Sequence, residues 1–448
     1  MASLPTGTRA EELGTRPLGR LLWWSCANTT ASVGIYGVYA LTNAWFVSRM
    51  VGETALAAVT LATPLLLLVG AVSTTVGVGA ASLVSRALGS GRPDDAARAT
   101  GNALALFWAV AGVTAVLGLT FLDPLLRMLG ATDATLPYAR PYAAVILAGA
   151  LVSTGFSAIV RAEGRLGFST LIWVTAVVVQ IVLDPLLILG LDLGVTGAAL
   201  GTVGGQAVSA ALALWFFFGQ RERPYRIAAA DLRPHRSTLR AMIGVGAPSF
   251  LAGVGATAVV AVVNSSLAAA GAAALAAFAV CARLQTFVTM PQIGITQGTQ
   301  PAVSFSAGAG LWSRAARAAT LSTRATVIYG AVAGLAVALA AQPLAALFLD
   351  AGEARDTAVT ALRIIAIGFA FSGVAPLVSG LFQAVGDARP SYALSVGTVV
   401  AIKLPLVIGL STLGPTGIWI ALPLGELLSA AAAIVLLRRS RGLRGVAA

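Results

Sequence analysis

The chain lacks the charged residues that a soluble enzyme carries. Only 10% of its 448 residues are charged, against about 25% in soluble proteins. Hydrophobic residues make up 58% of the chain, and its mean hydropathy is +0.88. Apolar runs of about 20 residues recur along its whole length, and this is the length that a membrane-spanning helix requires. The composition therefore excludes a large soluble enzyme and predicts an all-α polytopic membrane protein.

Residues that do chemistry are also scarce. The single histidine, His235, lies among arginines and away from any carboxylate cluster, so we interpret it as a solvated residue. The two cysteines, Cys26 and Cys281, lie far apart in apolar segments and form neither a metal spacing nor a disulfide framework. The only lysine, Lys403, follows no glycine-rich phosphate loop. We therefore predict no catalytic site, no metal site and no cofactor. The absence of a phosphate-binding loop argues against ATP-driven transport by this chain alone.

The apolar runs define twelve predicted membrane-spanning helices. The N-terminus has no apolar core with a cleavage site, so we expect the first helix, and no signal peptide, to direct insertion. The predicted ranges are 20–46, 55–84, 99–121, 139–160, 167–190, 194–218, 241–268, 273–304, 318–340, 358–383, 391–412 and 415–437.

The net charge of +12 is distributed unevenly between the loops. With both termini placed in the cytosol, 22 of the 29 lysines and arginines fall in cytosolic segments. This asymmetry is what the positive-inside rule predicts for a multi-pass membrane protein. The basic excess therefore indicates membrane topology, and we predict no nucleic-acid partner.

The two halves of the sequence repeat each other. A shift of 219 residues places 52–99 on 271–318 without a gap, with 16 of the 48 positions identical. At a shift of 220, Pro185 and Gly194 meet Pro405 and Gly414. Six helices return the chain to its starting side, so the halves have parallel orientation. We predict two six-helix lobes, 1–219 and 241–448, joined by a basic cytosolic linker at 220–240.

One acidic residue interrupts an apolar run in the first half, in the stretch VLDPLLIL at 182–189. A charge inside the membrane costs roughly 2.5–3.5 kcal/mol or more and usually has a function. Gln180 lies one helical turn from Asp184, and Thr202 and Asn43 lie at similar depth on other helices. Burial lets a carboxyl group take up and release a proton near neutral pH. These four residues form a candidate ion-coupling site; alternatively, Asp184 is solvated and merely ends its helix.

The second half contains three charged residues in the central parts of predicted helices: Arg283, Lys403 and Glu426. They form either a charge network that holds the helices together or a second charge-coupled site. The stretch MPQIGITQGTQPAVS at 290–304 has two prolines and two glycines, which should bend its helix. Its Gln297 and Gln300 offer hydrogen-bonding groups to a substrate cavity.

Several motifs resemble the MATE family of multidrug and toxic-compound extrusion transporters. They are NAWFVSRMVGETALAAV, LDPLLILGLDLGVTGAALGT, MPQIGITQGTQP and FQAVGDARPS, in the order and at the helices where that family has them. The resemblance covers about residues 18–437. It implies an antiporter, here a monomer in the inner membrane of a bacterium, that exchanges protons or sodium for amphipathic, often cationic drugs. Its partners would be small molecules and the lipid bilayer.

The resemblance also implies which residues couple transport to the ion. In prokaryotic members an aspartate on the first helix, an asparagine and an aspartate on the fifth and a threonine on the sixth form the site. These positions fall on Asn43, Gln180, Asp184 and Thr202, and only the last two match. The family's alternative acidic positions on the seventh and tenth helices are also not acidic; the polar residues there are Asn264, Ser372 and Gln383. One carboxylate favours protons over sodium, because the negative field is halved.

Other functions fit the sequence less well. A flippase for lipid-linked precursors or polysaccharides is the main alternative, but such relatives often carry extra helices or many cationic residues in the central cavity. A major-facilitator carrier shares the 6+6 organisation without these motifs. A membrane-embedded enzyme would need a catalytic cluster, and a channel would not need two unlike lobes with bendable helices.

Overall fold

The computed structural model describes residues 10–50, 53–153, 155–220, 222–440 and 443, with the exception of some side chains between residues 36 and 68. Within these residues the chain is helical, without strands. The first half contains α1 to α9: Glu12–Thr15, Leu18–Met50, Glu53–Gly89, Pro93–Thr120, Leu122–Met128, Leu136–Ala148, Ser157–Ala162, Leu166–Pro185 and Gly194–Leu214. The second half contains α10 to α19: Arg236–Ala270, Ala272–Gly308, Trp312–Leu339, Ala341–Ala346, Glu353–Ile365, Phe369–Ser372, Val374–Val385, Ala388–Tyr392, Leu404–Ser411 and Pro415–Arg439.

Each predicted membrane-spanning range coincides with one helix or with a series of consecutive helical segments. Ten helices among the described residues are long and apolar enough to cross a membrane. The other two ranges are α2, whose second half has undescribed side chains, and the range that contains α6 and α7, which is interrupted. The prediction of an all-α polytopic membrane fold is confirmed.

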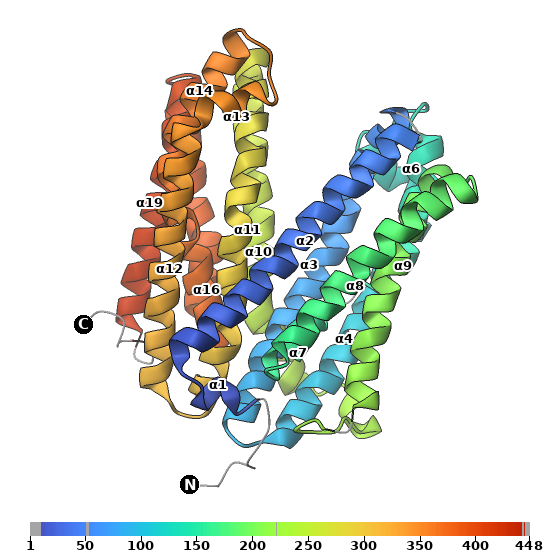
Figure 1. Cartoon of the computed structure of the whole chain (residues 1–448), viewed down its shortest axis with the longest axis vertical. Coiled ribbons are helices and arrows are strands. Elements are labelled where there is room, and N and C mark those ends of the chain that lie inside the picture. Colours follow the sequence, from blue (N-terminus) through green and yellow to red (C-terminus); the bar gives the residue numbers. More distant parts are fainter. Residues whose placement is uncertain (1–9, 51–52, 154, 221, 441–442, 444–448) are drawn as a thin grey trace. The chain divides into compact units, whose positions relative to one another are not determined.

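The chain divides into two compact units. Of the described residues, the first contains Ala10–Glu12 and Ala31–Ala247, and the second contains Leu13–Thr30 and those from Pro248 onward. In the first unit α8 and α9 run side by side (Figure 1), and in the second α11 packs against α12. These units differ from the predicted lobes at two places, since the start of α2 belongs to the second unit and the start of α10 to the first. Each unit has its own apolar core, with Tyr142 in the first and Trp419 in the second.

The fourth and tenth predicted helices are not continuous, in contrast to the sequence-based expectation. A 3-10 turn at Gly149–Leu151 precedes the break before α7, and another at Ala366–Gly368 separates α14 from α15. A polar side chain from a neighbouring helix supports each break. Ser73 of α3 donates to the carbonyl of Ser153, and Gln292 of α11 donates to the carbonyl of Phe369 at 3.0 Å. These carbonyls are therefore satisfied by tertiary hydrogen bonds, which local sequence does not predict.

The internal repeat is visible in the backbone. Gly91 and Gly310, which a shift of 219 superimposes, have φ angles of 69° and 72°. Gly194 and Gly414, related by a shift of 220, also have positive φ, at 51° and 74°. A side chain at these positions would strain the backbone. The internal repeat that the sequence predicts is thus reproduced in the turns of both units.

Candidate functional site

Asp184, Gln180 and Thr202 come together between α8 and α9 of the first unit. Gln180 Nε2 donates to Asp184 Oδ2 at 3.3 Å and to Thr202 Oγ1 at 3.2 Å. All three residues are at most 2% exposed. The carboxylate is followed by Pro185 and by one turn of π-helix at Leu186–Gly190, an irregularity often found at functional sites. The structure therefore joins three of the four predicted ion-coupling residues in one buried cluster.

Glycines on α9 let the two helices approach closely enough to build this cluster. A Cβ on Gly201 would overlap Asp184 Oδ1, and a Cβ on Gly205 would overlap the carbonyl of Ala176 on α8. Small residues at four-residue spacing are typical of close helix pairs in membranes. Gly201 is thus a site residue that the sequence analysis missed, although it lies within the quoted stretch LDPLLILGLDLGVTGAALGT.

The fourth predicted residue, Asn43, has a side chain outside the described residues. Its position on α2 is described, but its contacts are not. Whether it joins the cluster remains a prediction.

Gly201→Ala should impair the site without removing a charge. The added methyl group must displace the carboxylate or separate the helices, so we expect ion-driven transport to fall roughly tenfold or more, as when a positioned group shifts by about 1 Å. The matched control is Gly112→Ala on α4, where a Cβ would meet nothing within 4 Å. Transport rates of both variants, normalised to the inserted protein, test the prediction. Equal rates would show that the close approach at Gly201 is dispensable.

The predicted residues of the second half lie at separate places in the second unit. Lys403 Nζ donates to Glu426 Oε1 at 2.6 Å. Arg283 is exposed, and its guanidinium lies 5.8 Å from the ring centroid of Phe348. Gln300 donates to the carbonyl of Gly380 at 3.4 Å, while Gln297 is half-buried on the same helix. The structure therefore pairs Lys403 with Glu426 and places Arg283 apart from them.

Sequence reasoning assigned no role to two buried glutamines of the second unit, although it identified Gln383 as a polar residue of the tenth predicted helix. Gln292 is 3% exposed; it accepts a hydrogen bond from Ser372 at 3.0 Å and contacts the helix break described above. Gln383 is also 3% exposed and exchanges hydrogen bonds with Ser249. The only available signal was their position within long apolar helices, where a polar side chain needs a partner.

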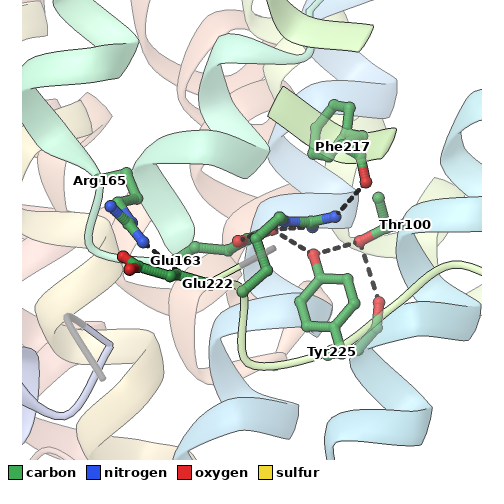
Figure 2. A network of polar contacts seen from close by, with 8 residues as sticks. Thr100, Glu163, Arg165, Phe217, Glu222 and Tyr225 are labelled. Carbon is green, nitrogen blue, oxygen red and sulfur yellow. Dashed lines mark hydrogen bonds and ion pairs between the residues drawn. The ribbon is translucent and has the colours of Figure 1, made fainter. Parts of the chain in front are cut away.

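A second missed cluster lies at the end of the first unit from which the linker emerges. Glu163 and Arg223 form a bidentate ion pair at 2.6 and 3.2 Å, with side chains 1% and 2% exposed. Tyr225 donates to Glu163 and also bonds Thr100 at 2.7 Å, so the linker contacts both the turn before α8 and α4 (Figure 2). The Arg223 guanidinium also lies 4.5 Å from the Tyr225 ring centroid.

Further along the linker, Asn102 donates to the carbonyls of Asp231 and Arg233 and accepts from the His235 amide. His235 itself is exposed. The segment that the sequence suggested was a solvated connection is therefore anchored to the first unit at several positions by buried polar groups.

The linker cluster predicts a dependence of stability on alkaline pH. Burial, followed by the Glu163 charge, raises the pKa of Tyr225 well above its ordinary value of 10.0. Above about pH 10 the unfolded chain loses this proton while the folded chain retains it, so stability falls as pH rises. Tyr225→Phe should flatten this decline, as thermal unfolding scans at rising pH would reveal. A decline of equal steepness in both proteins would contradict the assignment to Tyr225.

No group of three or more histidine, cysteine, aspartate or glutamate side chains is placed to hold a metal ion in the part of the chain that the structure describes. The candidate site is accordingly a cluster of one carboxylate, one amide and one hydroxyl. Such a group can bind a proton or a small cation in a buried environment.

Known proteins match both the sequence and this fold. A protein of Shewanella oneidensis named "FAD transporter" is 27% identical over 433 residues, which cover 94% of this chain and 95% of that protein. "Multidrug export protein MepA" of Staphylococcus aureus is 28% identical over 415 residues and 90% of each chain. Among solved structures, an outward-facing MATE multidrug resistance transporter has a TM-score of 0.90 at 24% identity, covering 96% of this chain and 97% of its own. A MOP superfamily transporter from Pyrococcus furiosus has a TM-score of 0.90 at 23% identity, covering 96% and 98%.

The MatE family matches residues 30–186 and 248–408, one stretch in each half of the chain. The two matched stretches correspond to the internal repeat, and together they cover more than half of the sequence. The expected resemblance is confirmed: the chain is a multi-pass membrane transporter that belongs to the MatE family.

Proposed function

We propose that the chain exports amphipathic cationic compounds across the cytoplasmic membrane of a bacterium in exchange for protons. The observation that carries the proposal is the buried carboxylate of Asp184, held by Gln180 next to Thr202 in a membrane-spanning helix pair. A buried carboxylate can alternate between a protonated and a charged state, and the charged state attracts a cation. Relatives named multidrug export proteins support the export of drugs.

Transport proceeds by alternating access of the two halves, with both termini in the cytosol. Parallel repeats of this type typically hold the substrate between the halves and move against each other. The excess of arginine in the loops on the side of the termini supports this orientation. Protons are favoured over sodium, because Asn43 and Gln180 leave one carboxylate where a sodium site would benefit from two.

The relative named "FAD transporter" suggests a second candidate, export of a large phosphate-containing anion. Such a substrate needs cationic groups to bind its phosphates. Within the membrane-spanning helices that the structure describes in the second unit, Lys403 is already paired with Glu426 and Arg283 is exposed beside Phe348. Arg283 remains available to a phosphate, so it is the buried Asp184 carboxylate that favours the cationic substrate.

The experiment is efflux from proteoliposomes loaded in turn with a cationic dye and with FAD. Each is measured under an imposed proton gradient, under a sodium gradient and with a protonophore. Dye efflux that follows the proton gradient and stops with the protonophore would support the proposal. Efflux of FAD alone, or dye efflux that requires sodium, would overturn the substrate or the ion, respectively.

A further inference from the structure

The two repeats contain equivalent helix hairpins. The α8–α9 hairpin of the first unit corresponds, at a shift of 220, to the hairpin that the helical span Ala388–Ser411 forms with α19 in the second. This span consists of α17, two π-helical turns and α18, and in each hairpin the two helices pack together. Pro185 and Pro405 occupy equivalent positions near the ends of the first helices. Gly205 and Gly425 occupy equivalent positions on the second helices, and both face the opposite helix. The hairpin that holds Asp184 therefore has a structural counterpart.

The counterpart holds an ion pair at nearly the same place. At this shift Lys403 falls on Leu183, the neighbour of Asp184, and Glu426 falls on Gln206, one turn beyond Thr202. A Cβ on Gly205 would lie 3.3 Å from Gln180 Cβ, and a Cβ on Gly425 would lie 3.4 Å from Lys403 Cγ. The two glycines thus face a residue of each cluster, Gly205 in a tight approach and Gly425 at ordinary contact distance. One cluster contains a carboxylate and the other a salt bridge.

The salt bridge is partly accessible. The Lys403 and Glu426 side chains are 25% and 17% exposed, whereas Asp184 is 1% exposed. Among the described elements that pack against α19, the other charged side chains lie on α14 and are Glu353, Arg355, Asp356 and Arg363. Neither Lys403 nor Glu426 forms an ion pair with any of them. Glu426 therefore has one counter-ion in the described structure, the Lys403 ammonium. A covalently attached cation occupies the position where a mobile cation would otherwise neutralise the carboxylate.

We propose that Lys403 is a tethered cation that fills a carboxylate site of the second repeat, and that removal of its charge makes Glu426 a second binding site for a proton or Na⁺. The native chain then exchanges an ion at one site only, the Asp184 cluster. This part of the proposal rests on the proposed function. The second site is permanently neutral and does not respond to the gradient. Ion binding by Glu426 can be measured directly, without a transport assay.

The test uses Lys403→Met in an Asp184→Asn background, so that the proposed coupling carboxylate contributes no signal. Infrared difference spectra of the purified protein in lipid record protonated carboxyl groups as pH is lowered from neutral to mildly acidic values. We expect a protonated-carboxyl band that is absent from Asp184→Asn alone. The band should also be absent from the variant that carries Glu426→Gln in addition, which assigns it to Glu426.

Sodium and choline salts distinguish the two possible ions. A band that sodium suppresses and choline does not would identify Na⁺ as a competing ligand, and a band that ignores both would identify the proton. A protein that remains folded and shows no band dependent on Glu426 would overturn the proposal. Lys403 would then be a structural partner only.

A second measurement does not require a mutant with an unpaired, partly buried carboxylate to fold. Because Lys403 is the only lysine, acetylation of the folded Asp184→Asn protein removes that side chain's charge, whereas reductive methylation keeps it. The N-terminal amine reacts in both cases and serves as the internal control. The acetylated protein should gain the Glu426 band and the methylated protein should not. Identical spectra at confirmed modification would contradict the tethered-cation role.

Discussion

Asp184→Asn is expected to reduce ion-driven efflux to the level of vesicles without transporter. The substitution preserves the shape of the side chain and its hydrogen bond with Gln180, but removes the group that binds the proton. An amide does not titrate in the physiological range, so no group in the cluster can take up and release the proton that drives transport. Binding of the cationic dye should weaken much less than transport. Dye uptake into inverted vesicles and equilibrium dye binding, measured on the same preparation, check both parts.

The matched control for this prediction is Asp192→Asn, an exposed acid on the turn between α8 and α9. Its backbone has a φ angle of 52°, a conformation that asparagine also adopts readily. We expect this variant to transport normally, because its carboxylate lies outside the cluster. Normal efflux by Asp184→Asn would remove Asp184 from the coupling mechanism. Loss in both variants would indicate that the turn, and not the buried carboxylate, is responsible.

Glu163→Gln is expected to destabilise the protein by about 3–5 kcal/mol, the usual cost of breaking a buried ion pair by removing one partner. Arg223 would remain buried and charged, and Tyr225 would lose a charged acceptor. The linker contacts in Figure 2 would therefore loosen together. Thermal unfolding in detergent measures the effect, and hydrogen exchange of linker amides locates it.

Glu222→Gln is the control, because Glu222 is exposed and contributes its backbone carbonyl, at 2.8 Å, to Arg165. We expect a change within about 0.5 kcal/mol for this surface substitution. The double variant Glu163→Met with Arg223→Met should recover part of the lost stability, since both charges are removed. A Glu163→Gln protein as stable as the Glu222→Gln control would contradict the structural role of the pair.

The candidate site was predictable to the extent that it depends on helical spacing. Gln180 and Asp184 are four residues apart, so they had to share a helix face, and the depth of Thr202 on the next helix followed from the turn between them. The four-residue spacing of Gly197, Gly201 and Gly205 indicated a close helix pair. The contact of Gly201 with Asp184 was not predictable, because it depends on how the opposite helix is placed. The contacts of Asn43 remain untested.

The fold departed from the prediction where tertiary hydrogen bonds replace local ones. Hydropathy gave continuous fourth and tenth helices, whereas Ser73 and Gln292 stabilise breaks in them. Glu163 and Arg223 were missed because 60 residues separate them and both lie near turns rich in arginine, which suggested a solvated surface. In the second half the sequence identified Lys403 and Glu426 as charges within helices, and the structure supplied their pairing.

The most direct test of the account is the proton movement that a substrate itself drives. Wild-type proteoliposomes with no imposed gradient would receive a pulse of cationic dye, and a trapped pH indicator would follow the lumen. We predict an alkaline shift in the lumen as dye enters and protons leave, and no shift with Asp184→Asn. Dye uptake by the wild type without any pH change, or an equal shift in the variant, would contradict proton exchange at Asp184.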